Sequence, residues 1–309
     1  MNNNPGQTPD IDDFLRGFSE GYQQGFAQGF SQGFSAGFSA EQPRNQAQLP
    51  HMPSVPASLP VSSAMGFKGV EATVVSKEVL SPSMVRLRVS APSLRGTRLA
   101  HTDSRIKIVL APPGAQYTWP FDRSELKRTQ PQHLMPVSRT YTVRSLDAET
   151  GEMDIDFFIH GTAGVAGPWA SNVEPGEKFG FYGPKGKWRP DPYVQRCVFV
   201  GDESAAPAIA AGLEALPEKV AATVFLEVER PGHELSLPPN AQVHWVYREG
   251  RRPGMALADA AVRYTPSESS CQWFVRGESR MARLLREELL KVRRLDKKQV
   301  SCAGYWKSK

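Results

Sequence analysis

Residues 139–144 read RTYTVR and place two arginines, two threonines and a tyrosine within six positions of a stretch that otherwise has the pattern of a β-strand. Side chains alternate along a strand, so one face carries Arg139, Tyr141 and Val143 and the other face carries the remaining three residues. Neither face is plainly apolar. Two interpretations remain open: a polar edge strand whose side chains oppose aggregation, or a strand end that binds an anionic, aromatic ligand.

Short strand-like runs surround this stretch between residues 66 and 190. Turn signals rich in Ser, Pro and Gly separate the runs, which is typical of an antiparallel barrel or sandwich. The runs are GVEATVVSKEVL (69–80), SMVRLRVS (83–90), RIKIVLAP (105–112), RTYTVRSL (139–146) and EMDIDFFIH (152–160), and EPGEKFGFYGPKGKW (174–188) closes the region. We predict a first domain, an antiparallel β-barrel, over residues 66–190.

From residue 195 onward, apolar strand-like runs alternate with segments of helical periodicity. The strand-like runs are QRCVFVG (195–201), AATVFLEVE (221–229), AQVHWVYRE (241–249), CQWFVRG (271–277) and KQVSCAGYW (298–306). Helical spacing marks residues 209–216, 254–264 and 281–289. This alternation predicts a doubly wound parallel sheet over residues 195–309, which binds ligands at the carboxyl ends of its strands.

The first 65 residues have a different composition. In GFSEGYQQGFAQGFSQGFSAGFSA (17–40) a glycine followed by an aromatic residue recurs every four positions, and a linker rich in Pro, Ser and Gln follows. A helix would wind this repeat into a spiral with no flat face, and glycine disfavours helix. We predict a mobile low-complexity arm. A segment for self-association or partner docking is the alternative.

Charge and cysteine content narrow the class of protein. The chain of 309 residues has a net charge of +5; five acidic residues against two basic ones give the first 45 residues a charge of −3, so the remainder carries +8. A basic body suits nucleic acid, a phosphate-bearing cofactor or an anionic small molecule. The three cysteines, Cys197, Cys271 and Cys302, lack metal-site spacing. With no secretory signal or membrane-span pattern, we expect a cytoplasmic protein without a metal site.

A glycine-rich loop follows the strand that ends at His160. In HGTAGVAGPWA (160–170), Gly161, Gly164 and Gly167 allow close backbone approach to a ligand, and Pro168 and Trp169 stand where a helix begins. The backbone N–H groups at such a helix start bind anions. A plain turn would use the same residues, so the position of the loop, one hairpin after RTYTVR, is what favours a binding role.

The order of these motifs resembles the siderophore-interacting proteins, the flavin-dependent ferric-siderophore reductases. The motifs are RTYTVR, DFFIHG with GVAGPWA, GEKFGFYGPKG, VGDESAAPAIAAGLEALP, GESRMARLLREEL and GYWK, and the resemblance covers roughly residues 66–307. The resemblance implies a ferredoxin-reductase-like architecture, an FAD-binding β-barrel followed by an NAD(P)H-binding α/β domain. It also implies a ferric siderophore as the substrate and no nucleic-acid partner.

The resemblance assigns roles in flavin binding to residues of the first domain. It places Arg139 on the pyrophosphate, Tyr141 against the ring system and Thr142 at the isoalloxazine. Arg144 is a further candidate, with a structural ion pair as its alternative. The matching positions of the glycine-rich loop are His160, Gly161, Gly164, Ala166, Gly167 and Trp169.

The resemblance also gives roles in nucleotide and substrate binding, to residues of the second domain and to Lys107 of the first. GDES, with Gly201, Asp202, Glu203 and Ser204, matches the turn of the family that binds the nicotinamide nucleotide. Candidate cations for an anionic ferric siderophore are Lys107, Arg248 and Lys307.

The sequence leaves open whether the nucleotide is NADH or NADPH. Glu227 and Glu229, at the end of the second predicted strand of the sheet, suit a free ribose, whereas Arg230 suits the 2′-phosphate of NADPH.

The mechanism implied by the resemblance needs no catalytic side chain, because the flavin itself takes a hydride from NADPH or NADH and passes electrons singly to iron. Two alternatives remain: a flavin reductase or ferredoxin-reductase-like enzyme with another acceptor, and a siderophore-binding protein without turnover. Bound FAD together with oxidation of the nicotinamide would favour the enzymes.

Overall fold

A computed structural model describes residues 69–159 and 164–308. The predicted N-terminal arm, with its proposed docking or self-association role, lies outside the described residues. His160 and Gly161 also lie outside them.

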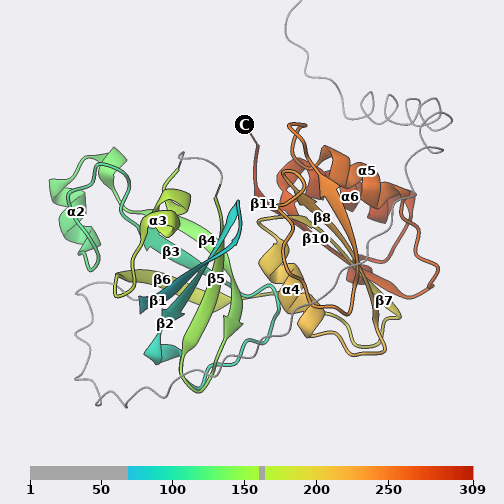
Figure 1. Ribbon diagram of the computed structural model, residues 1–309, viewed down its shortest axis with the longest axis horizontal. Helices are drawn as coiled ribbons and strands as arrows, with labels where there is room; N and C mark the ends of the chain where they lie inside the picture. The colour runs from blue at the N-terminus through green and yellow to red at the C-terminus, as the bar shows by residue number, and fades with distance from the viewer. Residues whose placement is uncertain (1–68, 160–163, 309) are drawn as a thin grey trace, which may run out of the picture. The chain divides into compact units, whose positions relative to one another are not determined.

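Six antiparallel strands close into a barrel in the order β1-β2-β5-β4-β3-β6 (Figure 1). The sequence runs are thereby confirmed as strands, and the segment that closes the region supplies the sixth. The strands are β1 (Val70–Ser81), β2 (Met84–Ser90), β3 (Arg105–Leu110), β4 (Val137–Leu146), β5 (Glu152–Phe158) and β6 (Lys178–Lys185). Strand β4, which contains RTYTVR, pairs with β3 and β5 and is therefore no edge strand.

Alternating apolar side chains fill the barrel, as the period of two requires. Leu87, Ile108, Ile155 and Phe181 are fully buried in one core cluster. The short helix α3 (Ala166–Asn172) adds Ala166 and Ala170 to the same cluster. The barrel therefore has a complete core of its own.

The connection between β3 and β4 contains a helix that the strand pattern did not predict. Helix α2 (Arg123–Thr129) begins at Asp122, whose carboxylate accepts hydrogen bonds from the backbone N–H groups of Ser124 and Glu125. This is an ordinary N-cap. Two single 3₁₀ turns, Pro92–Leu94 and Gln132–Leu134, complete the loops of the barrel.

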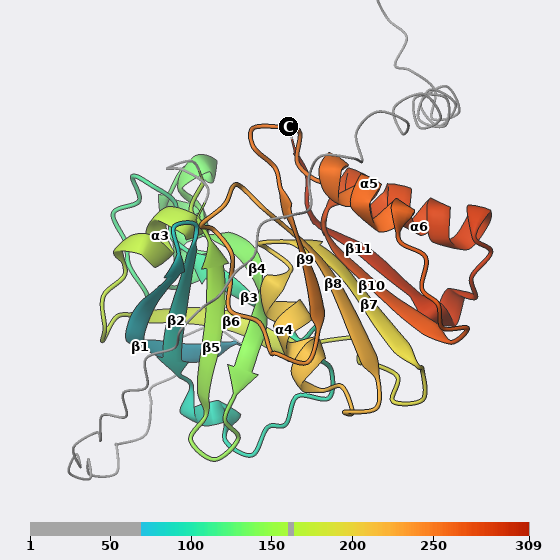
Figure 2. The same cartoon turned by 45° about the vertical axis from the view of Figure 1, so that its right-hand side comes forward.

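The second half of the chain is a five-stranded parallel sheet in the order β11-β10-β7-β8-β9. Helix α4 packs on one face, and α5 and α6 pack on the other (Figure 2). The elements are β7 (Arg196–Asp202), α4 (Ala206–Glu214), β8 (Ala221–Val228), β9 (Gln242–Tyr247), α5 (Met255–Arg263), β10 (Cys271–Glu278), α6 (Ser279–Glu287) and β11 (Val300–Trp306). A π-helical segment, Glu288–Val292, follows α6, and a 3₁₀ turn, Lys297–Gln299, precedes β11. The order reverses at β7, which fixes where a nucleotide binds in such a sheet.

A buried ion pair links residues of the two halves. Asp103, 1% exposed, accepts hydrogen bonds through Oδ1 from the backbone N–H groups of Lys187 and Trp188, at 2.7 and 2.8 Å. Its Oδ2 lies 3.3 Å from Nη2 of Arg276 on β10. The guanidinium of Arg276 lies over the ring of Phe274, 4.1 Å from its centroid. One carboxylate thus satisfies a connecting segment and a buried cation together.

The ends of β7 and β10 approach so closely that Gly277 admits no side chain. Its φ is +132°, and a Cβ there would lie 2.5 Å from Oδ2 of Asp202. Gly176 shares a positive φ, +94°, but a Cβ there would meet no atom within 4 Å. A substitution at Gly176 would therefore cause backbone strain alone, whereas one at Gly277 would cause both strain and crowding.

We predict that Gly277→Ala destabilises the protein by about 3 kcal/mol or more, because strain and overlap with Asp202 act together. Gly176→Ala is the control and should cost about 1 kcal/mol from strain alone. Urea denaturation followed by tryptophan fluorescence measures both. Equal losses in the two variants would contradict the crowding at Gly277.

Candidate functional site

The two faces of β4 have different surroundings. Val143 is buried in the barrel core and Tyr141 packs on it, with its ring 4.3 Å from that of Phe157. Burial raises the pKa of Tyr141 to about 12, against a smaller opposing effect of Arg139. The Tyr141 face of β4 thus runs from the barrel core at Val143 through the half-buried Tyr141 to the exposed Arg139.

The opposite face of β4 forms a polar row with its neighbour β3. Thr142 lies directly across from Arg105, and Thr140 lies directly across from Lys107. The buried hydroxyl of Tyr305 on β11 lies near Thr142 and Arg276 but has no hydrogen-bond partner among the described residues, and burial raises the pKa of this phenol. The last strand of the sheet therefore reaches the strand that the sequence predicts to bind the flavin.

The two arginines of RTYTVR are held differently. Arg139 is exposed, and one terminal nitrogen donates to the carbonyl of Ser138 at 2.9 Å. Arg144 forms a two-pronged ion pair with Glu214 of α4, at 2.8 and 2.5 Å. Both terminal nitrogens of Arg144 are thereby engaged. The structural ion pair that the sequence analysis gave as the alternative is thus present, and a role of Arg144 in flavin binding stays a prediction.

The described part of the glycine-rich loop is open on one side. Gly164 has a φ of +91°, and a Cβ there would meet no atom within 4 Å; a Cβ on Gly167 would find its nearest neighbour, a carbonyl oxygen, at 3.9 Å. Ala166 is buried in the barrel core. The backbone at both glycines is therefore accessible to a ligand.

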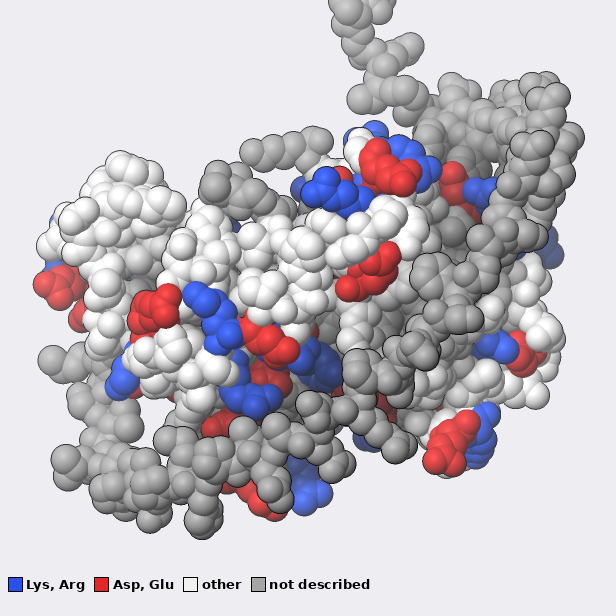
Figure 3. All heavy atoms as spheres, viewed as in Figure 1, with Lys and Arg blue, Asp and Glu red and all other residues white. Residues whose placement is uncertain are grey.

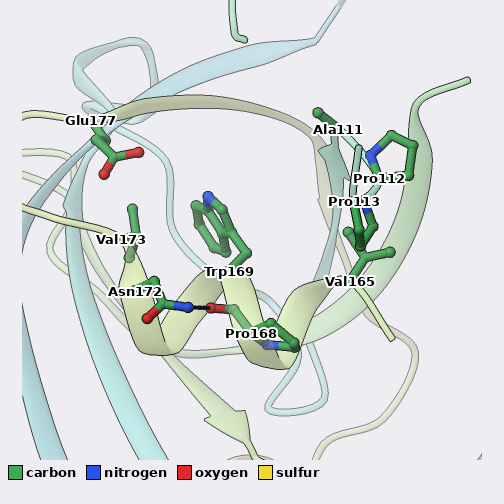
Figure 4. A pocket seen from close by; sticks show the side chains of 9 residues that line it. All are labelled: Ala111, Pro112, Pro113, Val165, Pro168, Trp169, Asn172, Val173 and Glu177. Carbon is green, nitrogen blue, oxygen red and sulfur yellow. Dashed lines mark hydrogen bonds between the residues drawn. The ribbon is translucent and has the colours of Figure 1, made fainter. Parts of the chain in front are cut away.

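Trp169 of α3 lies beside a hollow of about 300 Å³ (Figure 4). Its ring meets Phe157 and Phe179 edge to face, with centroids 5.7 and 5.2 Å away. Two prolines and Val165 form the opposite side. The remaining lining residues are Ala111, Pro168, Asn172, Val173 and Glu177. This largely apolar hollow adjoins the loop that was predicted to bind the flavin.

The GDES turn directs its side chains inward. Asp202, 2% exposed, accepts hydrogen bonds from the N–H and hydroxyl of Ser204, from Glu278 N and from Trp306 Nε1. Even so, burial raises the pKa of Asp202. A Cβ on Gly201 would lie 2.6 Å from that of Ala205. The Asp202 side chain thus builds the turn, in which the backbone N–H groups of Ser204 and Ala205 donate to Asp202 itself.

Three carboxylates surround Arg248 at the carboxyl ends of β7 and β8. Its Nη2 lies 3.1 Å from Glu203, its Nη1 3.3 Å from Glu227 and its Nε 2.9 Å from Glu229. The Arg248 side chain is 7% exposed. Arg248 thus binds three carboxylates of its own domain, and its role as a substrate ligand stays a prediction.

This cluster carries more negative than positive charge. Burial raises the pKa of Glu203 to about 7, although Arg248 opposes the shift, and burial also raises the pKa of Glu227. Glu227 is fully buried and additionally accepts the backbone N–H of Gly254 at 3.0 Å. A proton at Glu203 therefore relieves repulsion among the three carboxylates near neutral pH.

Lys107 and Lys307 remain exposed, and between residues 69 and 308, apart from 160–163, neither has a carboxylate within ion-pair distance. Lys107 belongs to the polar row beside β4, and Lys307 follows Tyr305 by two positions. Both lysines stay candidates for an anionic substrate.

Sequence reasoning missed Tyr305, Asp103 and Arg276. A signal for Arg276 exists, since it is a cation inside the apolar run CQWFVRG. Asp103 stands in a loop and carries no such signal, and Tyr305 was noticed only as part of GYWK. The contacts of these three residues become visible only in the folded chain, where β10 and β11 lie beside the barrel loop that contains Asp103.

Much of the positive charge is paired. On the face in view in Figure 3, basic and acidic side chains lie beside one another, with uncharged surface between them. Arg86 binds Asp156 at 2.6 Å and Arg88 binds Asp154 at 2.9 Å. Each such pair is neutral as a whole, so the positive potential of the protein comes from the basic side chains outside these pairs.

Comparison with known proteins decides the family. The sequence profile of the siderophore-interacting FAD-binding domain matches residues 73–188, and the profile of the siderophore-interacting proteins matches residues 194–309. The chain belongs to the siderophore-interacting protein family. Its barrel is an FAD-binding domain of that family.

Similar proteins agree with this family. Ferric vibriobactin reductase ViuB of Vibrio cholerae is 31% identical over 240 residues, which cover 75% of this chain and 87% of ViuB. A siderophore utilization protein from T. fusca is 28% identical, with 78% and 93% of the two chains covered and a TM-score of 0.66. Ferredoxin-NADP⁺ reductase from Plasmodium falciparum, at 13% identity, 76% and 96% coverage and a TM-score of 0.57, shares the fold. The predicted ferredoxin-reductase-like architecture is confirmed.

Two properties of the described residues bear on localisation and metal binding. Among the helices of residues 69–159 and 164–308, none has both the length and the apolar character needed to cross a membrane. The same residues hold no group of three His, Cys, Asp or Glu side chains placed to bind a metal ion.

We predict that the stability of the wild type relative to Glu203→Gln falls by roughly 1 to 3 kcal/mol as the pH rises from 5 to 8. The pKa of Glu203 rises from 4.5 unfolded to about 7 folded. The folded state therefore binds the extra proton in this window and loses stability as that proton leaves. Urea denaturation at several pH values measures the difference, with the exposed Glu218→Gln as control. A pH-independent difference for Glu203→Gln would contradict the assignment.

Proposed function

We propose that this chain is a flavoprotein that takes electrons from NADPH or NADH and reduces the ferric iron of a siderophore complex. Membership of the siderophore-interacting family supports the proposal, as does the relative named as a ferric vibriobactin reductase. The observation that carries it is the polar row on β4, where Thr142 meets Tyr305 of the nucleotide-binding half. The strand proposed to bind the flavin, β4, thus lies beside the half of the chain proposed to bind the nicotinamide nucleotide.

The residues at β4 and the glycine-rich loop fit FAD. Arg139 presents an exposed guanidinium at the strand, which suits a pyrophosphate. The backbone of Gly164 and Gly167 is accessible in the loop that follows β5, the next strand after β4. Tyr141 and Thr142 offer a buried ring and a hydroxyl for the ring system. When bound, FAD accepts two electrons as hydride and delivers them one at a time.

The side chains of this protein then bind and orient the cofactor and the ferric complex. Arg139 holds the pyrophosphate, and Thr142, backed by Tyr305, positions the ring system. Lys107 and Lys307 attract the anionic ferric complex to this end of the barrel. One NAD(P)H thereby reduces two ferric ions and yields NAD(P)⁺, one proton and two ferrous ions. Ferrous iron binds hard oxygen ligands more weakly, so reduction releases it.

The function is tested by an anaerobic assay of the full chain loaded with FAD. The ferric complex of 2,3-dihydroxybenzoate serves as substrate, a ferrous chelator reports the product, and NADPH and NADH are supplied in turn. Two ferrous ions should form for each nicotinamide oxidised. Oxidation of the nicotinamide only in the presence of oxygen or free flavin would favour a flavin reductase, and no oxidation would favour a binding protein.

We predict that Arg139→Ala weakens FAD binding about 10- to 100-fold, because a charge-assisted contact of roughly 1.5 to 3 kcal/mol is lost. The flavin-to-protein ratio and a fluorescence titration measure this. Arg98→Ala removes another exposed arginine of the barrel and should retain the flavin. Full flavin occupancy in Arg139→Ala would mean that β4 does not hold the pyrophosphate.

We predict that Lys107→Ala combined with Lys307→Ala raises KM for the anionic ferric complex about 3- to 10-fold, because each exposed cation contributes up to about 1 kcal/mol. Flavin content should stay at the wild-type level. Raising the ionic strength should reduce the difference between the two proteins. An unchanged KM at low salt would remove both lysines from the substrate site.

A further inference from the structure

Arg230 stands where a doubly wound sheet recognises the adenosine ribose of a nucleotide. It follows Val228, the last residue of β8, by two positions, and β8 lies beside the central strand β7 in the parallel sheet. A carboxylate near this strand end accepts hydrogen bonds from a free ribose, as in NAD, whereas an arginine accommodates the 2′-phosphate of NADP. Both residue types occur here, so their surroundings decide between them.

The carboxylates at this strand end are already occupied. Glu227 is fully buried and binds Arg248 and the N–H of Gly254. Glu229 binds Nε of Arg248 at 2.9 Å. Arg248 thus engages both carboxylates, Glu227 in the interior of the domain and Glu229 at its surface, where the Glu229 side chain is 43% exposed. A free ribose would have to compete with a buried guanidinium for them.

In contrast to these carboxylates, the guanidinium of Arg230 has donors that are not engaged. Its side chain is exposed, and its Nε lies 3.3 Å from Nε2 of His233. Within residues 69–159 and 164–308, its two terminal nitrogens have neither a hydrogen-bond partner nor a carboxylate within ion-pair distance. The planar fork that suits a phosphate is therefore available at the strand end.

The backbone holds Arg230 in place. Residues 230–233 form a tight turn in which the N–H of His233 donates to the carbonyl of Arg230 at 3.2 Å. Pro231 occupies the second position, and Gly232, with a φ of +89°, occupies the third, as a type II turn requires. Proline and glycine thus fix the turn before any ligand arrives.

The imidazole of His233 fixes the side chain of Arg230. An arginine only donates, so Nε2 of His233 accepts, and Nδ1 carries the proton toward Ser83 Oγ at 3.2 Å. His233 and Ser83 are 8% and 6% exposed. Ser83 belongs to the turn between β1 and β2 of the barrel. A buried chain of contacts therefore sets the direction of an exposed guanidinium.

The neighbouring strand end is also basic. Arg251 and Arg252 follow β9 and are exposed, and Arg251 donates to the carbonyls of Tyr247 and Arg248 at 2.6 and 3.2 Å. The nearby acid Glu234 is engaged by Tyr247 and by the N–H of Gly232, both at 2.7 Å. Arg230, Arg251 and Arg252 are thus exposed cations at the ends of β8 and β9, where Glu249 is exposed as well, and their guanidinium groups can attract a phosphate dianion.

We propose that Arg230 binds the 2′-phosphate of NADPH, so that this chain prefers NADPH to NADH. The inference rests on the proposed use of a nicotinamide nucleotide. It adds the choice between the two nucleotides, which the fold leaves open, and it identifies a phosphomonoester subsite at the carboxyl end of β8.

The test compares 2′,5′-ADP with 5′-AMP by calorimetric titration of the full FAD-loaded chain at fixed ionic strength. We expect 2′,5′-ADP to bind the wild type at least 10-fold more tightly than 5′-AMP. Arg230→Gln should abolish this difference and leave 5′-AMP binding unchanged. Arg98→Ala, which removes an exposed arginine elsewhere, should behave as the wild type.

A second variant tests the role of the imidazole. His233→Ala removes the acceptor for Nε of Arg230 but keeps the guanidinium, so 2′,5′-ADP binding should weaken about 2- to 5-fold. Equal affinity of the wild type for the two adenosine phosphates would overturn the proposal. So would an equal loss of both affinities in Arg230→Gln, since that result indicates general attraction of anions.

Kinetics separate this proposal from the proposed function. The ratio of kcat/KM for NADPH to that for NADH should fall 10- to 100-fold in Arg230→Gln. Efficient ferric reduction with NADH and a poor rate with NADPH would overturn the proposal while the function stands. If neither nicotinamide is oxidised, the proposed function fails, and the titration with 2′,5′-ADP still decides the phosphate subsite.

Discussion

The buried pair of Asp103 and Arg276 is the interaction on which the other contacts between barrel and sheet depend. Removing Asp103 would leave a guanidinium 5% exposed without its charge partner and two backbone N–H groups without their acceptor. A buried cation without its partner costs about 3 to 5 kcal/mol, more than one surface ion pair returns. The ion pair of Arg144 with Glu214 is a second link between the two halves of the chain.

Strand β4 shows how one short sequence serves two environments. Its inner face completes the barrel core through Tyr141 and Val143. Its outer face carries hydroxyls and meets the cations of β3 and the phenol of β11. Polar side chains in this strand do not reduce stability, because they lie at a boundary where a charged ligand and a second domain can satisfy them.

The sequence was sufficient for the strands and for the order of the domains along the chain, because alternation and helical periodicity are local properties. Helix α2 was not predicted because its seven residues show no apolar stripe, although Asp122 marks its start. The partners of Arg144 and Arg248 could not be predicted, because Glu214 and Glu203 belong to distant elements that only the folded chain brings near. The flavin roles of Arg139, Tyr141 and Thr142 remain predictions, now with compatible surroundings.

The tight turn that carries Arg230 has a consequence for communication along the chain. His233 joins this turn to Ser83, so the first hairpin of the barrel and the nucleotide end of the sheet share one hydrogen-bonded chain. By thermodynamic linkage, a ligand that binds Arg230 more tightly when this chain of hydrogen bonds is intact would also stabilise the chain, and loss of the chain would weaken that ligand. Under the proposed role of Arg230, the barrel hairpin would thereby contribute to nucleotide recognition without touching the nucleotide.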